Sequence, residues 1–179
     1  MEKRAGRIII QTPGGTAAKG SYTYKLSIPS SWIKEMGLSE DSRQVELFFD
    51  GTTISVTKRL SINEYISINK EKMHELFELL FYDGQMLCTK IVADYTEKTI
   101  CIENYIDDFI RTAFGNNFIP TWNDYEMFLE DRCIPRSRAG LREYLEAIGV
   151  DKYDPLEIIK KTEGRMSEDN QWLKVEVIK

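Results

Sequence analysis

Short runs of β-branched and aromatic residues, separated by polar turns, fill the first third of the chain. Such runs, bounded by Gly, Pro, Asp and Ser, are typical of β-strands. Asp50-Gly51 joins the last two and is a strong local signal for a β-hairpin. The predicted strands are 7–11, 22–28, 44–49 and 52–57.

A single short helix is predicted between the second and third of these strands. Pro29 ends the strand pattern, and Ser30 or Ser31 is expected to cap a helix that stops at Gly37. Residues 12–21, TPGGTAAKGS, are rich in Gly, Thr and Ser and are expected to form a loop.

This first block has more apolar surface than it can cover alone. Val45, Leu47, Phe49, Ile54 and Val56 alternate along the last two predicted strands and define apolar faces. A block of about 60 residues leaves much of its apolar surface wet. We therefore expect a homodimer in which two copies share one core.

The middle of the chain changes its pattern. Residues 60–69 show no clean period and are expected to be a junction. Met73, Leu76, Phe77 and Leu80 recur at helical spacing and predict a helix over 70–82, ended by Asp83-Gly84.

The remainder reads as a hairpin followed by helices. The hairpin is expected at 86–93 and 99–103, four helices at 105–114, 122–132, 138–148 and 155–162, and a last strand at 171–178. Capping residues agree with the helices: Thr121 with Asp124, Ser137 with Gly149 after its helix, and Asp154 before Pro155.

These elements predict an α+β protein of two unlike modules. The first is a dimerising domain over residues 5–60, the second an acidic, mainly helical α+β module with a β-hairpin over residues 85–179, and residues 61–84 form a junction and helix between them.

Composition adds little to the fold but constrains location. The opening MEKRAGRIIIQTPGG has three consecutive strong apolar residues, too few for a secretory signal, and no apolar run approaches the roughly 20 residues of a bilayer span. We expect a cytoplasmic protein without a membrane partner.

Charge separates the two modules. Residues 1–60 contain nine Lys/Arg and six Asp/Glu, net +3, whereas residues 61–179 contain 15 and 23, net −8. The first module can attract a polyanion, and the second is a poor nonspecific binder of nucleic acid.

Catalysis and cofactors find little support. Cys88, Cys101 and Cys133 are far apart, and His74 is the single histidine, so a zinc site would need nearly all of them. Neither Ser30 nor Ser31 lies in a GxSxG elbow, and residues 12–21 lack the order of a phosphate loop. We expect a protein that is not an enzyme and has no cofactor or metal.

An arginine cluster stands out in the acidic module, within EDRCIPRSRAGLR. Guanidinium groups suit phosphate or carboxylate recognition, which makes the cluster a speculative site for a partner or an anion. Ion pairs with Glu126, Glu130 and Glu146 are the favoured alternative. Its members are Arg132, Arg136, Arg138 and Arg142. Arg138 and Arg142 are four residues apart and are expected to share a helix face.

The first module resembles the AbrB/MazE/SpoVT swapped-hairpin family. The run KLSIPSSWIKEMGLSEDSRQVELFFDGTTISVTK has that family's order of strand, Ile-Pro, short helix, Gly-Leu, acidic turn and two strands around a polar turn. The resemblance covers about residues 5–60, and Lys25 and Lys34 fall where the family carries basic residues. The acidic module is similar to C-terminal regions of uncharacterised bacterial proteins that carry the same N-terminal block.

The resemblance implies an interleaved homodimeric β-barrel that binds DNA. We therefore expect a bacterial-type, sequence-specific transcriptional regulator whose second module binds a partner or effector, with an autoregulating antitoxin as a close variant. A dimeric protein–protein inhibitor or adaptor, whose acidic module binds a basic protein, is the alternative. The expected DNA face consists of Arg4, Arg7, Lys19, Lys25 and Lys34, with Ser30 and Ser31 as phosphate contacts.

Overall fold

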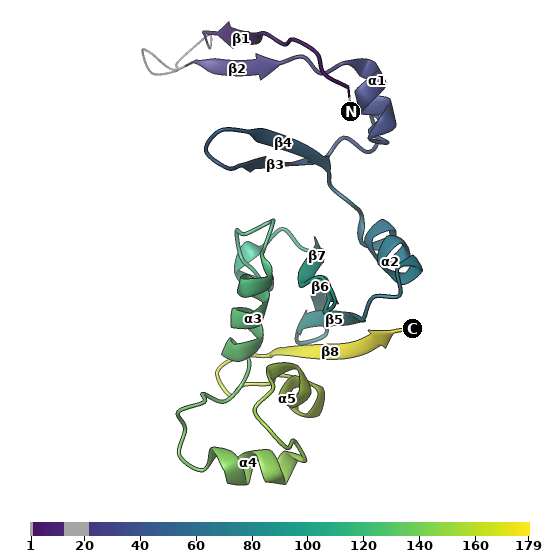
Figure 1. The fold of residues 1–179 in the computed structure, drawn as a ribbon. Helices are drawn as coiled ribbons and strands as arrows, with labels where there is room; N and C mark the ends of the chain where they lie inside the picture. The colour runs from purple at the N-terminus through teal and green to yellow at the C-terminus, as the bar shows by residue number, and fades with distance from the viewer. Residues whose placement is uncertain (1, 13–21) are drawn as a thin grey trace. The chain divides into compact units, whose positions relative to one another are not determined.

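The chain folds as two units, Met1–Arg59 and Leu60–Lys179. The computed structural model describes residues 2–12 and 22–179, and Figure 1 shows the elements of both units. The loop expected at 12–21 lies outside the described residues except for Thr12.

The first unit consists of two separate antiparallel hairpins and one short helix. The first hairpin pairs β1 with β2, and the second pairs β3 with β4. The four predicted strands are thus confirmed, with small shifts at their ends. The elements are β1 (Ile8–Gln11), β2 (Thr23–Leu26), α1 (Ser30–Glu35), β3 (Val45–Phe49) and β4 (Ile54–Lys58).

A side chain stabilises the β3–β4 turn of this unit, whereas no side chain caps the start of α1. The Asp50 carboxylate accepts hydrogen bonds from the backbone N–H groups of Thr52 and Thr53, which closes the β3–β4 turn as expected. The expectation that Ser30 or Ser31 caps α1 is wrong. Pro29 holds the N-cap position, and its side chain has no acceptor for a capping hydrogen bond. The Pro29 carbonyl accepts from the N–H groups of Trp32 and Ile33.

The second unit is built on a four-stranded antiparallel sheet with the order β7-β6-β5-β8. The C-terminal strand therefore pairs with β5, which comes first of the four in the sequence. The elements are α2 (Ile62–Glu71), β5 (Leu76–Asp83), β6 (Met86–Asp94), β7 (Thr99–Asn104), η1 (Phe109–Arg111), α3 (Trp122–Asp131), α4 (Leu141–Ile148), α5 (Pro155–Thr162) and β8 (Gln171–Ile178).

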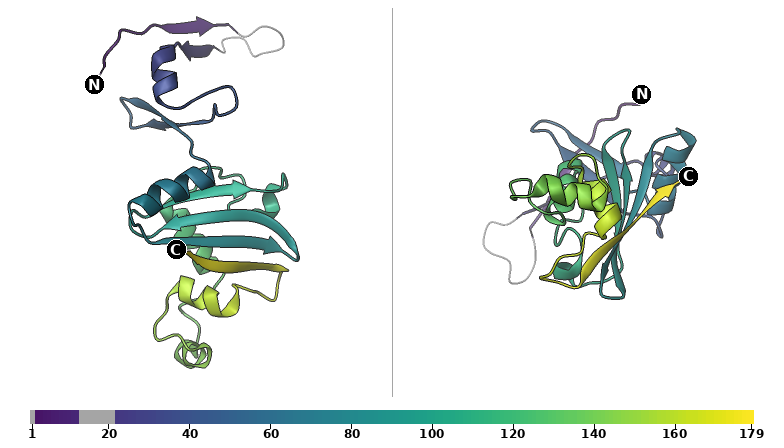
Figure 2. Two further views of the ribbon diagram at one scale, coloured as in Figure 1. Left: turned by 90° about the vertical axis from the view of Figure 1, so that its right-hand side faces the viewer. Right: turned by 90° about the horizontal axis from the view of Figure 1, so that it is seen from below.

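Both faces of this sheet are covered, by different helices. One face buries Leu79 and Ile91 against α3, α4 and α5, which supply Tyr125, Leu145 and Ile158. A smaller cluster on the other face packs α2 against Val92. Figures 1 and 2 show α3 and α2 on opposite sides of the strands.

The prediction of a helix over 70–82 is wrong, since residues 76–83 form the central strand β5. Leu76 and Phe77 point to opposite faces of the sheet, and both are buried. A strand buried on both faces has a near-continuous apolar run, in which helical spacing appears by coincidence. Pairing with β6 and β8 overrides the helical preference of the local sequence.

The helix instead occupies the expected junction, as α2. Ser61 and Glu64 form a reciprocal capping box at its start. Lys72 ends it, and Met73 adopts a left-handed conformation (φ 60°) that redirects the chain into β5. The region 61–84 is therefore a helix and a strand of the second unit rather than a junction and a helix.

Two further helix predictions need correction. Of residues 105–114 only η1 is helical, since Arg111 is drawn to Asp83 and the Ala113 N–H donates to Thr89. The helix expected at 138–148 begins at Leu141, because its N-cap, Gly140, has a positive φ (78°). Ser137 does not cap it.

Other predictions for the second unit are confirmed. The 86–93/99–103 hairpin is β6–β7, and α3, α5 and β8 lie where expected, with the Thr121–Asp124 capping box and Asp154 as N-cap. The α+β class is correct, although the second unit is less helical than expected. Neither unit contains a closed barrel among the described residues, and no helix there is long and apolar enough to cross a membrane.

A pair of substitutions tests β5. Leu79 is fully buried, whereas Met73 is 91% exposed. We expect Leu79→Ala to lower the free energy of unfolding of the second unit by about 2–5 kcal/mol, since it leaves a cavity. Met73→Ala is expected to change it by less than about 0.5 kcal/mol. Urea unfolding followed by circular dichroism measures both, and similar losses would favour a helix with Met73 on its apolar face.

Candidate functional site

The first unit has no core of its own. Every described residue in Met1–Arg59 is exposed or half-buried. Leu47 and Phe49 on β3 are 66% and 71% exposed, and Ile54 on β4 is 67% exposed. Isolated two-stranded hairpins are marginally stable at best in water. These apolar surfaces therefore have no cover among the described residues of the first unit.

Strand register places most of the exposed apolar residues on one face of each hairpin. Cross-strand partners share a face. In the first hairpin Ile8 lies opposite Leu26 and Ile10 opposite Tyr24. In the second, Leu47 lies opposite Val56 and Phe49 opposite Ile54. Each hairpin thus presents a continuous apolar face.

Lys25 lies on the other, more polar face of the first hairpin. It pairs with Ile9, and the neighbouring pair on that face is Gln11 with Thr23. Arg7 directly precedes β1, and both basic side chains are exposed. The first hairpin therefore separates an apolar face from one that carries positive charge.

Arg4 is held by neighbours. Its guanidinium pairs with Glu2 at 2.7 Å and lies 5.7 Å from the centre of the Trp32 ring. The Trp32 indole N–H donates to the other Glu2 oxygen at 2.8 Å. The hydrogen bonds from Trp32 and Arg4 lower the pKa of Glu2. The N-terminal segment is thus attached to α1.

The remaining expected DNA contacts lie on or near α1. Ser30 and Ser31 are its first two residues, and Lys34 is in its last turn; all three are exposed. Lys19 falls outside the described residues. The described candidates therefore come from two places, the first hairpin with its leading segment and α1.

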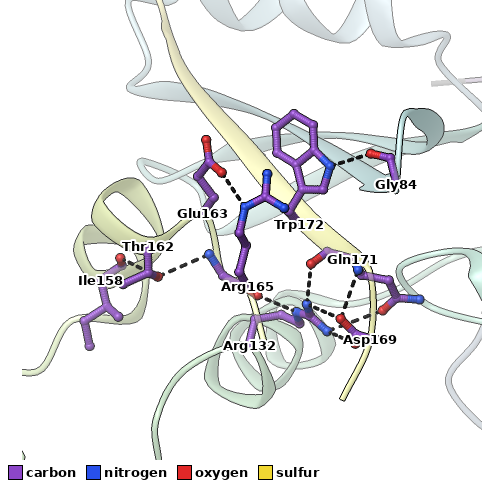
Figure 3. Close-up of polar contacts among 10 residues, drawn as sticks. Gly84, Arg132, Ile158, Thr162, Glu163, Arg165, Asp169, Gln171 and Trp172 are labelled. Atoms are coloured by element: carbon purple, nitrogen blue, oxygen red, sulfur yellow. Dashed lines mark hydrogen bonds and ion pairs between the residues drawn. The ribbon is translucent and has the colours of Figure 1, made fainter. Parts of the chain in front are cut away.

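Arg132, from the cluster in the second unit, is a buried structural clamp (Figure 3). It is 8% exposed, and its five N–H groups all have acceptors. It forms a bidentate pair with Asp169 at 2.6 and 3.1 Å, and donates to the carbonyls of Gly164 and Gln171 and to the Gln171 side chain. No N–H group is left for an anion.

This clamp joins the end of α3 to the segment that leads into β8. Arg165 continues the arrangement: it pairs with Glu163 and lies 4.9 Å from the centre of the Trp172 ring, whose N–H donates to the Gly84 carbonyl (Figure 3). The hydrogen bond from Arg132 lowers the pKa of Asp169. The ion pair with Arg132 therefore favours the negatively charged form of Asp169 in the folded protein.

The rest of the arginine cluster separates. Arg136 pairs with Glu130 at 2.7 Å and Arg142 with Glu146 at 3.0 Å, as the ion-pair interpretation expected. Arg138 precedes α4, so it does not share a helix face with Arg142. Among the described residues, no hydrogen bond or ion pair is found for the Arg138 guanidinium. The four arginines do not form one pocket.

His74 has a structural environment. Its ring Nδ1 lies 2.6 Å from Asp94, whose other oxygen accepts from the backbone N–H groups of Thr96 and Glu97. In residues 2–12 and 22–179, no three His, Cys, Asp or Glu side chains gather to hold a metal ion. The three cysteines are free thiols.

One hollow in the second unit was not anticipated from the sequence. Tyr95, Trp122, Tyr125 and Tyr153 line it together with acidic residues. These aromatics are spread over almost 60 positions, and their separate local patterns gave no signal that the fold brings them together.

Comparison with protein families, curated proteins and solved structures gave no match in any of the three.

The Arg132 clamp generates a prediction about acid stability. Asp169→Asn is expected to lower the free energy of unfolding at neutral pH by about 2 kcal/mol, since it removes the charge from a hydrogen-bonded ion pair. Because folding lowers the pKa of Asp169, this contribution is present above the pKa of an unfolded aspartate, about 3.9, and is lost as pH falls through the lower folded value. The variant should therefore lose less stability on acidification than the parent.

Urea unfolding at a series of pH values measures this difference. Glu146→Gln is the matched control, because the Arg142–Glu146 pair is exposed and is expected to contribute at most about 0.5 kcal/mol. Parallel pH profiles for Asp169→Asn and the parent would contradict the clamp.

Proposed function

We propose that this protein is a cytoplasmic, sequence-specific DNA-binding transcriptional regulator that acts as a homodimer. The first unit forms the dimer and contacts DNA, and the second unit binds a partner or effector without being an enzyme. The observation that carries the proposal is the pair of exposed apolar hairpin faces in a unit with no buried described residue.

A second copy of the chain is the partner that fits these faces. Seven of the eight side chains on the two faces are more than half exposed, and each would gain about 1 kcal/mol if the surface now in water were covered. Together that is roughly 7 kcal/mol for each copy, similar to the whole stability of a small domain. The eight are Ile8, Ile10, Tyr24, Leu26, Leu47, Phe49, Ile54 and Val56, of which Val56 is half-buried.

The resemblance to the AbrB/MazE/SpoVT family implies how the two copies would pair. In that family, hairpins of two copies interleave into one barrel. Two unclosed hairpins joined by α1 are what one copy would contribute to such a barrel.

Positive charge supports DNA as the ligand of the dimer. Arg7, Lys25 and Lys34 are exposed, and a two-fold axis doubles each of them. The first 59 residues carry nine Lys/Arg against six Asp/Glu, a net +3 within an acidic chain. Cations on a hairpin face and a short helix suit phosphates that flank a groove.

An autoregulating antitoxin remains a variant of this proposal, in which the second unit would neutralise a toxin. The adaptor alternative has its own supporting observation, the net charge of −8 in the second unit. In the adaptor, the first unit would dimerise without binding DNA.

The DNA proposal predicts a salt-dependent interaction that depends on two lysines. Lys25→Ala/Lys34→Ala removes four charges from a dimer. If each neutralises one phosphate, the slope of log affinity against log salt concentration should become shallower by about 3–4. Fluorescence anisotropy with duplexes selected from a random library measures this change.

Lys72→Ala/Lys152→Ala is the control, since it removes the same charge from exposed positions of the second unit. It should leave the slope unchanged. Equal effects of both double variants, or no salt-sensitive affinity in the parent protein, would contradict DNA binding and favour the adaptor.

A further inference from the structure

The aromatic hollow of the second unit is a defined cavity of about 430 Å³ beside α3 and the start of α5. Tyr95, Trp122 and Tyr125 form a packed wall: the Trp122 ring centre lies 5.0 Å from each of the two tyrosine rings. The Tyr95 and Tyr125 hydroxyls are 3.1 Å apart. The wall thus consists of π-systems held in place by contacts with one another.

Carboxylates surround this wall. Glu126, Glu130 and Asp154 line the same cavity. Burial, with smaller contributions from the nearby charges of Asp154 and Glu126, raises the pKa of Tyr95 to about 12. Asp154 also caps α5. Aromatic faces with carboxylates at their side attract organic cations.

A cation of the chain itself already uses one side of the cavity. The Arg136 guanidinium lies 4.2 Å from the centre of the Tyr153 ring and pairs with Glu130 at 2.7 Å. Glu126 and Asp154 have no ion pair among the described residues. After Arg136 neutralises Glu130, the cavity keeps two negative charges.

We propose that this cavity binds an arginine side chain of a basic polypeptide partner. A guanidinium stacks on an aromatic ring and pairs with a carboxylate at the same time, which is the arrangement that Arg136 makes. Glu126 and Asp154 hold the incoming arginine, and Arg136 competes with it for Tyr153 and Glu130. The inference rests on the proposed function only in assigning partner binding to the second unit.

Two observations favour a polypeptide over a free amine. From the start of β7 to the end of α3, residues 99–131 contain seven Asp/Glu and one Lys/Arg, and that one, Arg111, pairs with Asp83. This acidic surface suits a ligand with several cations. In addition, Arg136 shows that a guanidinium fits one side of this cavity, stacked on Tyr153 and paired with Glu130. The planar guanidinium makes both contacts at once, whereas the ammonium of a free amine is a point charge without a flat face.

The test is titration of the full chain with a labelled peptide of alternating arginine and serine at low ionic strength. Glu126→Gln/Asp154→Asn should weaken binding about fivefold or more, and asparagine keeps the cap of α5. Arg136→Ala should strengthen binding several-fold, because it vacates Tyr153 and Glu130. Unfolding would weaken peptide binding in both variants. It therefore cannot explain a loss in Glu126→Gln/Asp154→Asn together with a gain in Arg136→Ala.

Controls separate the cavity from general attraction to an acidic unit. Glu71→Gln/Glu97→Gln removes the same charge from exposed positions, and Arg142→Ala removes an exposed arginine; both should leave affinity unchanged. Equal losses in the two acidic double variants, or equal gains in Arg136→Ala and Arg142→Ala, would overturn the proposal. So would spermidine binding with the same dependence on Glu126 and Asp154.

DNA affinity measured on the same variants keeps the two proposals distinct. The cavity variants should bind DNA as the parent does, since their residues belong to the second unit. Peptide binding without DNA binding would contradict the proposed regulator and leave the arginine site in place. DNA binding without peptide binding would do the reverse.

Discussion

The two apolar hairpin faces of the first unit have no cover among its own described residues, and the proposed homodimer follows from this constraint. Two two-stranded hairpins and a six-residue helix bury none of their described side chains. A chain of this composition gains its stability from apolar surface removed from water. The described residues of the first unit therefore leave these apolar faces uncovered, and in the proposed homodimer a second copy covers them.

The second unit covers its apolar surface with its own helices. Its sheet is covered on both faces, and β8 returns from the end of the chain to pair with β5. The buried Arg132 clamp attaches the segment before β8 to the end of α3, with an acceptor for every guanidinium N–H. A self-contained unit of this kind can present a cavity to a partner whatever the first unit binds.

Local signals in the sequence identified the elements that depend on local chemistry. Asp50-Gly51, the Thr121–Asp124 capping box and the Asp154 cap were all readable, because each acts within three residues. The Ser61–Glu64 capping box before α2 is an equally local signal, and the prediction of a junction at 60–69 misses it. By contrast, β5 is a strand because it pairs with both β6 and β8, and no local pattern reports the pairing with β8, almost 100 residues later.

The same distinction applies to the candidate sites. Pairs close in sequence, such as Arg136 with Glu130 and Arg142 with Glu146, were expected from spacing. Arg132, by contrast, pairs with Asp169, 37 residues away in the sequence. The aromatic cavity likewise combines side chains from separate elements. The apolar surface that the first unit leaves exposed could be predicted from the alternation of Leu47, Phe49, Ile54 and Val56. Such alternation depends only on the residue types and their spacing along each strand.

Sedimentation equilibrium of the full chain at micromolar concentration tests the central claim most directly. The account predicts a mass of about 42 kDa, twice the 20.8 kDa of one chain. It also predicts a shift toward the single-chain mass in Leu47→Asp, which places a charge on an apolar face. A parent protein that sediments at 20.8 kDa throughout the concentration range would contradict it.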